Sequence, residues 1–184
     1  MQNNTGGDKL LDVNLILNKV QIDEKMCVAD FGCGASGHFV FPTAKIVGST
    51  GKVYAVDILK TVLETIERRK KLENFENVIS VWSNLEVFGA AKIESGSIDV
   101  ALLINTLYQS HKRANILREA IRTVKKGGKV VVIEWKNISI PFGPPIKKRV
   151  NVENLKTGGA KLGLKLEEEF NAGPYHYGLI FSKL

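Results

Sequence analysis

Hydrophobic positions along the chain form two kinds of pattern. Short continuous apolar runs are typical of strands buried on both faces, and apolar residues three or four apart are typical of helices that cover a sheet. The runs predict strands at residues 26–31, 52–56, 78–82, 98–104, 129–135, 164–170 and 176–182. The wider spacing predicts helices at residues 8–20, 39–47, 59–72, 113–124 and 152–162. Asp8 is the expected N-cap of the first helix, and Gly127 and Gly128 are expected to end the fourth.

The predicted strands and helices alternate, with short connections, through the first five strands. This order is typical of a parallel sheet with helices on both faces. The last two predicted strands are joined by residues 171–175, a hairpin-type turn that contains Gly173 and Pro174. We therefore predict an α/β fold with a doubly wound, mostly parallel, seven-stranded sheet that ends in an antiparallel hairpin.

A glycine-rich segment follows the first predicted strand. Gly32, Gly34 and Gly37 have the spacing G-x-G-x-x-G, and Asp57 ends the next predicted strand about 20 residues later. Glycines permit a tight turn and a close approach of ligand to backbone. The Asp57 carboxylate could accept hydrogen bonds from both hydroxyls of a ribose. These features predict a cofactor that contains adenosine, either NAD or S-adenosylmethionine (SAM).

Asp30 favours SAM over NAD. It lies two residues before Gly32, where its carboxylate would face the negative pyrophosphate of NAD but would favour the ammonium and sulfonium groups of SAM. The alternative is that Asp30 caps amides of the loop. Tyr108 and Lys112 have the spacing found in short-chain dehydrogenases, but they follow the fourth predicted strand rather than the fifth. We interpret that spacing as a coincidence.

Four segments, taken in order, resemble motifs of the class I SAM-dependent methyltransferases. Residues 28–34 resemble motif I, residues 53–57 the acidic-loop motif, residues 97–105 motif IV, and residues 125–134 the passage from a helix into the fifth strand. The similarity is closest to the small-molecule branch that includes ubiquinone and menaquinone methyltransferases. It implies one SAM-binding domain over residues 25–184, which transfers a methyl group to an acceptor and releases S-adenosylhomocysteine.

The resemblance also implies roles for residues at the strand ends. The glycine loop would lie under the methionine and ribose, and Asp57 and Ile58 would contact the ribose and adenine. Asn84 would face the adenine amino group, and Leu85 would pack on the ring. The expected cofactor-binding residues are Asp30, Gly32, Cys33, Gly34, Gly37, Asp57, Ile58, Asn84, Leu85, Asn105 and Thr106.

Candidates for the acceptor side follow the fourth and fifth predicted strands. His111 is the candidate general base, and the alternative is a surface histidine on a loop or at the start of a helix. Tyr108 is a second catalytic candidate, which either contacts the substrate or closes the methionine pocket. Trp135 either stacks on a flat substrate or caps the sheet, and the sequence leaves both open. Residues 141–145 contain three prolines and form either a stiff wall over a pocket or a plain connector. No spacing of ligand residues supports a metal site.

Charge leaves a further alternative open. The net charge is +7, with basic clusters at residues 68–71, 125–126 and 147–149. Such clusters suit a polyanion such as RNA, although aromatic residues do not alternate with them, and they are also typical of solvated surfaces. The rival functions are an NAD(P)-dependent oxidoreductase and a non-catalytic module that binds SAM or RNA. The acceptor, whether a small molecule or a macromolecule, and the oligomeric state are not predicted.

Features of the termini and cysteines complete the expectations. Residues 1–24 are predicted to form a helical segment that closes over the cofactor as a lid. Cys27 and Cys33 run from a strand into its loop and are not expected to form a disulfide. No apolar run approaches the roughly 18–20 residues that span a bilayer. We therefore expect a cytoplasmic protein.

Overall fold

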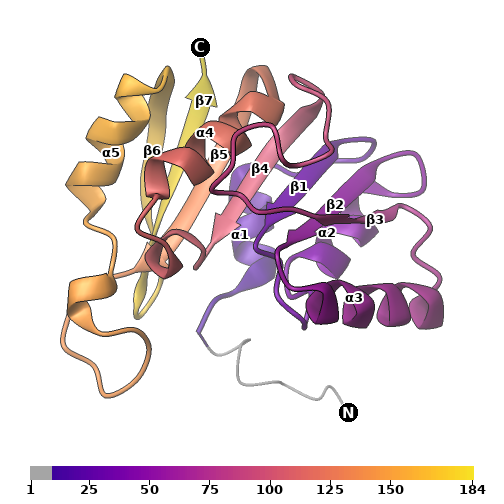
Figure 1. Ribbon diagram of the computed structural model, residues 1–184, viewed down its shortest axis with the longest axis horizontal. Coiled ribbons are helices and arrows are strands. Elements are labelled where there is room, and N and C mark those ends of the chain that lie inside the picture. Colours follow the sequence, from indigo (N-terminus) through magenta and orange to yellow (C-terminus); the bar gives the residue numbers. More distant parts are fainter. Residues whose placement is uncertain (1–9) are drawn as a thin grey trace.

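Parallel strands with apolar side chains on both faces make up the centre of the sheet. The computed structural model describes residues 10–184, and its strand order is β3-β2-β1-β4-β5-β7-β6 (Figure 1). The strands are β1 (Cys27–Phe31), β2 (Lys52–Asp57), β3 (Val78–Trp82), β4 (Ile98–Ile104), β5 (Val124–Trp135), β6 (Leu164–Gly173) and β7 (His176–Lys183). β1 to β5 pair in parallel, and β7 pairs antiparallel with both β5 and β6. The predicted fold class is confirmed.

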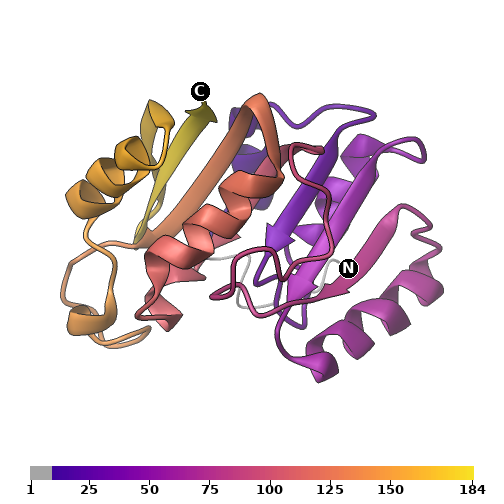
Figure 2. The ribbon, with the colours of Figure 1, turned by 45° about the horizontal axis from the view of Figure 1, so that its top comes forward.

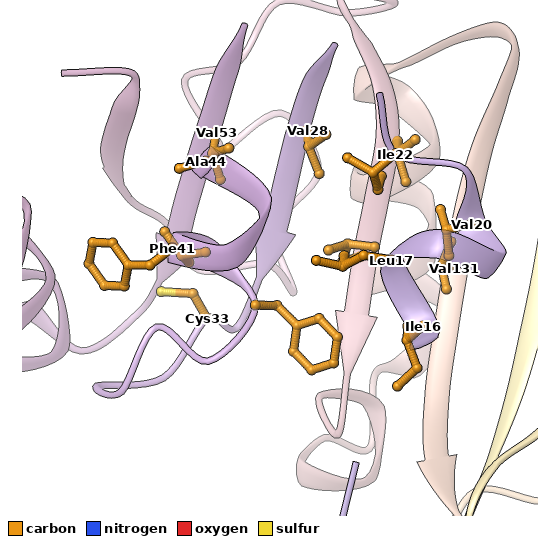
Figure 3. Packing of buried hydrophobic residues seen from close by; sticks show 14 of the residues in the cluster. Ile16, Leu17, Val20, Ile22, Val28, Cys33, Phe41, Ala44, Val53 and Val131 are labelled. Carbon is orange, nitrogen blue, oxygen red and sulfur yellow. The ribbon is translucent and has the colours of Figure 1, made fainter. Parts of the chain in front are cut away.

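Helices cover both faces of the sheet. α1 (Val13–Val20), α2 (Val40–Val47) and α3 (Lys60–Glu73) contribute to one hydrophobic core, and α4 (Arg113–Thr123) and α5 (Val152–Lys161) contribute to the other. Figure 2 shows α4 and α5 lying across the sheet. In the first core, Leu17 and Val20 of α1 pack with Val28 and Val131 of the sheet (Figure 3). α1 therefore shares its core with the sheet.

Two expected helix ends are wrong. α1 begins at Val13 after the N-cap Asp12, whose side chain accepts a hydrogen bond from the amide of Leu15 at 3.0 Å. The expected cap Asp8 lies outside the described residues. Gly127 and Gly128 do not end α4, which stops at Thr123, but lie inside the long strand β5. A Cβ at Gly128 would lie 2.8 Å from the carbonyl oxygen of Asp99, so this glycine permits close pairing with β4.

The terminal hairpin is tighter than expected. β6 continues to Gly173, which pairs with His176, so the turn consists of Pro174 and Tyr175 rather than the whole of residues 171–175. β7 then returns between β5 and β6. This antiparallel return places the start of β7 at the same edge of the sheet as the end of β5, where Trp135 pairs with His176.

The connection from β3 to β4, residues 83–97, contains no helix and crosses the face of the sheet as a loop. The buried Glu119 of α4 holds it by accepting hydrogen bonds from the amides of Gly89 at 2.6 Å and Ala91 at 2.9 Å. Arg122 pairs with Glu119 and also donates to the carbonyl oxygens of Ala91 and Ile93. The loop is thus fixed from α4, and its first residues reach the carboxyl ends of the strands.

Within residues 10–184, no helix has both the length and the apolar character that crossing a membrane requires.

Candidate functional site

Two neighbouring cavities lie at the carboxyl ends of β1, β2 and β4, where ligands bind in doubly wound sheets. The first has a volume of about 360 Å³ and the second about 370 Å³. Both are lined by Gly32, Gly34 and Gln109. The first is also lined by Asp57, Ile58, Leu59, Val62, Ser83, Asn84, Leu85, Glu86, Thr106, Ser110 and Ile116. The second is also lined by Leu10, Leu11, Asp30, Cys33, Ser36, His38, Phe39, Ile104, Asn105 and Tyr108.

The glycine loop lies between the two cavities and lines both. Its backbone conformation disfavours residues with side chains. Gly32 has a φ of +81°, and a Cβ there would lie 2.9 Å from two side-chain atoms of Thr106. The amides of Gly32 and Cys33 donate to the carbonyl oxygen of Val56 at 2.8 and 3.1 Å, which ties the loop to β2. Gly34 has a φ of +64°, and a Cβ there would meet no atom within 4 Å. The space beside Gly34 is therefore open to a ligand.

Gly37 has a different surrounding from the other two glycines. A Cβ on Gly37 would lie 2.6 Å from the ring of Phe41 and 2.8 Å from the side chain of Ile66. It lines neither cavity. Among the expected cofactor-binding residues, Gly37 is the one that packs the glycine loop against helices α2 and α3 instead of lining a cavity. Gly37 thus has a packing explanation.

Two backbone amides, one from the glycine loop and one from the chain after β2, hold the carboxylate of Asp57. One carboxylate oxygen accepts a hydrogen bond from the amide of Gly34 at 3.2 Å, and the other accepts from the amide of Leu59 at 3.0 Å. Asp57 is buried yet lines the first cavity. Its carboxylate is therefore a pre-oriented acceptor for hydroxyl groups.

Asp30 lines the second cavity from the end of β1. Burial, together with the nearby negative charge of Asp57, raises the pKa of the Asp30 carboxyl to about 7. Among residues 10–184, Asp30 forms no ion pair, and a ligand cation in the second cavity would favour its ionised form. Cys33 lies on the same wall, where burial and Asp30 raise the pKa of its thiol. Cys33 is consequently a neutral wall of the cavity.

Asn105 is held in an uncommon conformation at the end of β4. Its φ is +54°, and its amide donates to the carbonyl oxygen of Ile133 at 2.8 Å. Its side-chain nitrogen lies 3.2 Å from Nε2 of His176, at the start of β7. The side-chain oxygen has no hydrogen-bond partner among the described residues. The contact with His176 thus orients the Asn105 amide at the second cavity.

His176 is a site residue that sequence reasoning did not place. It is fully buried, and its ring lies 4.2 Å from that of Trp135, measured between ring centroids. Burial, and then the positive charges of Lys136 and Arg149, lower the pKa of His176 to about 4, so the imidazole is neutral near pH 7. The signal that could have found it was the pairing of β7 with β5, which chain order alone does not give.

Glu134 positions the turn that carries Tyr108. The side chain of Glu134 is fully buried at the end of β5, and its Oε1 accepts from the amides of Leu107 at 2.7 Å and Tyr108 at 3.2 Å. These bonds hold the 3-10 turn η1 (Leu107–Gln109) against the sheet. Burial, partly offset by these amides, raises the pKa of Glu134 to about 7. Burial and then Glu134 raise the pKa of Tyr108, which remains a hydroxyl donor.

Two acceptor-side candidates lie outside both cavities. His111 is exposed and lines neither of them. Trp135 is buried between His176 and the proline-containing loop, where Gly143 leaves room for its ring. Trp135 thus lies at the end of β5 outside both cavities, and its role toward a substrate remains a prediction. Across residues 10–184, no group of three or more His, Cys, Asp and Glu side chains is placed to hold a metal ion.

Comparison with known proteins identifies the family. Residues 22–171 match the family described as "Methyltransferase domain". The chain belongs to this family. It is 30% identical over 117 residues to a demethylmenaquinone methyltransferase from Lactococcus lactis subsp. lactis, a match that covers 64% of this chain and 45% of that protein. This methyltransferase-domain chain thus spans less than half the length of the curated relatives it matches.

Solved structures share the fold of this methyltransferase domain. A SAM-dependent methyltransferase from Aquifex aeolicus has a TM-score of 0.88 at 22% identity, with 99% of this chain and 95% of that chain covered. The [4+2]-cyclase SpnF has a TM-score of 0.79 at 13% identity, with 93% and 80% covered. The expected family and fold are therefore confirmed, and the oxidoreductase alternative receives no support. The cyclase shows that the fold alone does not decide the reaction.

Proposed function

We propose that the protein transfers a methyl group from SAM to an acceptor and releases S-adenosylhomocysteine. The observation that carries this proposal is the arrangement of two carboxyl groups on either side of the glycine loop. Asp57 presents fixed acceptors to the first cavity, and Asp30 presents to the second a buried carboxyl that has no cationic partner in the part of the chain that the structure describes. A ligand with ribose hydroxyls at one end and a cation at the other matches both. Membership of the methyltransferase family supports the reaction type.

The residues around the first cavity suit the adenosine part of SAM. Asp57 would accept hydrogen bonds from the ribose, and Ile58 and Leu85 would pack on the adenine. The side-chain oxygen of Asn84 accepts from the amide of Glu86 at 3.0 Å, which fixes the amide group at the cavity wall. Because Gly34 carries no side chain and has open space beside it, the cofactor could pass from the first cavity into the second.

The residues of the second cavity would orient the methionine part and the acceptor. When bound, SAM supplies a methyl group that its sulfonium already activates. Asp30 would hold the cationic end, and Asn105 and Tyr108 would contribute a carboxamide and a hydroxyl. Leu10, Leu11, Phe39 and Ile104 form the apolar part of the remaining wall, and Ser36, His38 and Gln109 form its polar part. The chain's contribution is then alignment and exclusion of water, which can supply about 7–11 kcal/mol of a barrier.

The same cavity supports the proposal that the N-terminal segment closes over the cofactor. Leu10 and Leu11 already line the second cavity, and the backbone of Leu10 lies close to Gly173 in the terminal hairpin. We also propose a small molecule as the acceptor, because the second cavity has a volume of about 370 Å³, in the range of small-molecule sites. The cytoplasmic location expected from the sequence remains a prediction, as does binding of RNA.

Calorimetry with SAM, S-adenosylhomocysteine and NAD tests the proposal. We expect SAM and S-adenosylhomocysteine to bind and NAD not to bind. Asp57→Asn keeps the shape of the side chain but removes its charge, and should weaken SAM binding at least about tenfold, or about 1.4 kcal/mol. Asp23→Asn, which changes an exposed carboxylate outside both cavities, is the control. Tighter binding of NAD, or equal affinities of the two variants, would contradict the proposal.

A further inference from the structure

The segment between β5 and α5, residues 136–149, projects beyond the carboxyl ends of the strands (Figure 1, orange). We call it the β5 loop. It exposes Ile138, Phe142 and Ile146, whose exposed fractions are 42%, 41% and 49%. Lys147 and Lys148 are exposed beside Ile146 in the 3-10 turn η2 (Ile146–Lys148). The sequence has no Asp or Glu from residue 136 to residue 152, so no acidic side chain within this segment offsets its positive charge.

The β5 loop is held in place from within. Arg149 is only 7% exposed, and its guanidinium donates to the carbonyl oxygens of Pro144 at 2.9 Å and Lys136 at 2.8 Å, and also to that of Ile138. The same group lies 5.9 Å from the centre of the Trp135 ring. The loop therefore exposes its apolar side chains in an ordered conformation, and a partner that binds them would not have to order the loop first.

We propose that the β5 loop docks on an anionic membrane surface. Apolar side chains next to lysines suit the boundary between headgroups and acyl chains, because the side chains enter the bilayer while the ammonium groups meet lipid phosphates. Ile138, Phe142 and Ile146 supply the apolar part, and Lys147 and Lys148 supply the charge. The partner is thus a bilayer with negative headgroups, bound at its surface.

The chemistry of the loop favours a membrane over RNA. RNA-binding surfaces use arginine and aromatic planes on which bases stack. The one arginine of the loop is turned inward and bonded to carbonyl oxygens. The ring of Phe142 is held edge to face by Tyr175 at 4.9 Å and by Trp135 at 6.2 Å, between ring centroids. Besides Phe142, the exposed large apolar side chains of the loop are the aliphatic Ile138 and Ile146, which offer bases no stacking surface.

The β5 loop adjoins the acceptor side of the site. Trp135 lies under the loop and against His176, and His176 contacts Asn105, which lines the second cavity. Docking would therefore bring the second cavity close to the bilayer. This inference goes beyond the proposed function and does not depend on it, because binding to vesicles requires neither cofactor nor turnover.

Co-sedimentation of the full chain with vesicles tests the inference. The probes are vesicles of phosphatidylcholine alone and vesicles that also contain phosphatidylglycerol. We expect sedimentation with the anionic vesicles only, weakened by high salt. Ile146→Ser should reduce the partition coefficient at least about threefold. Lys147→Gln with Lys148→Gln should reduce it about tenfold.

Matched controls come from α3, in which Leu72 is 77% exposed next to Lys70 and Lys71. Leu72→Ser, and separately Lys70→Gln with Lys71→Gln, should leave vesicle binding near the wild-type value. Absence of sedimentation with anionic vesicles at low salt would overturn the inference. So would equal losses in the β5-loop and α3 variants, which would indicate general charge attraction. Dependence on the lysines but not on Ile146, with release by an RNA oligonucleotide, would overturn it in favour of polyanion binding.

Discussion

The two cavities are assembled in different ways. Around the first, the glycine loop meets residues that follow it closely in the chain: Gly34 bonds to Asp57, and Gly32 bonds to Val56. Around the second, Asn105 is oriented by His176, 71 positions away, at the start of a strand that runs against its neighbours. The contact between the glycine loop and Asp57 lies within one βαβ unit and carries its signature in a short stretch of sequence. The contact between Asn105 and the distant strand β7 does not.

Two buried carboxyl groups, Asp30 and Glu134, also differ in what they contact. Asp30 lines a cavity, whereas Glu134 is turned toward the amides of Leu107 and Tyr108 and lines neither cavity. Burial raises the pKa of both to about 7. Similar titration behaviour therefore accompanies two different tasks, ligand recognition and support of a turn. The variants below separate those tasks and test whether the two cavities are independent.

Gly32→Ala should have the largest effect on stability, because Gly32 lines both cavities and lies against Thr106. Its φ is +81°, and the new Cβ would displace Thr106, whose hydroxyl donates to the carbonyl oxygen of Phe31 at 2.8 Å. We expect the free energy of unfolding to fall by about 2–4 kcal/mol. Gly34→Ala, with a φ of +64° and no neighbour near its Cβ, should lose only about 1 kcal/mol. Urea denaturation followed by circular dichroism measures both, and equal losses would show that the contact with Thr106 does not restrict position 32.

His176→Phe tests the distant part of the second cavity. The pKa of His176 is about 4 in the folded protein, below its usual 6.5. Between these values the unfolded chain binds more protons at this residue, so His176 makes stability rise with pH, by roughly 1–3 kcal/mol. Asp30 and Glu134, with raised pKa values, act in the opposite direction. The difference between wild type and His176→Phe isolates the histidine.

Denaturation at pH 4.5 and pH 7 measures that difference. We expect the variant to lose less stability than the wild type on acidification. His111→Gln, which changes an exposed histidine outside both cavities, is the control and should resemble the wild type. If His176→Phe also behaved as the wild type, the imidazole would not be a neutral partner of Asn105.

The smallest expected effect concerns the pH dependence of SAM binding. It should distinguish the role of Asp30 from that of Glu134. As the pH rises from 6 to 8, Asp30 with a pKa of about 7 becomes ionised, and a cationic ligand should bind about fivefold more tightly. Asp30→Asn should abolish this increase, whereas Glu134→Gln should retain it because Glu134 lines neither cavity. Calorimetry at the two pH values measures it. Loss of the increase in Glu134→Gln alone would reverse the assignment.

Most of the fold could be predicted from the sequence because the strands are buried on both faces and read as continuous apolar runs. The same reasoning failed where one residue type serves two purposes. Gly127 and Gly128 indicate a helix end, but here Gly128 permits β5 to approach Asp99 in β4. The loop over residues 83–97 gave no periodic pattern, because its position depends on hydrogen bonds to Glu119 and Arg122 of α4.

Some site residues could be predicted from the sequence and others could not. Asp57 lines the first cavity as the motif spacing suggested, and Ile58, Asn84 and Leu85 line it as the family resemblance implied; their roles toward SAM remain predictions. On the acceptor side, proximity to β4 and β5 in the chain favoured His111 and Trp135, which line neither cavity.

Other residues of the site were missed. Gln109 lines both cavities from η1, and His176 reaches Asn105 only through the antiparallel return of β7. Chain order does not specify which strands a terminal hairpin will join.

The chain has two tryptophans, and the fold assigns one to each part of the site. Trp82, 54% exposed at the end of β3, donates its indole hydrogen to the carbonyl oxygen of Ile58 beside the first cavity. Trp135, 7% exposed, lies between His176 and the β5 loop. Their emission should differ in wavelength, because one indole is in water and the other is in an apolar surrounding. The protein thus has two intrinsic fluorescent probes, and single-tryptophan variants could follow events at each part separately.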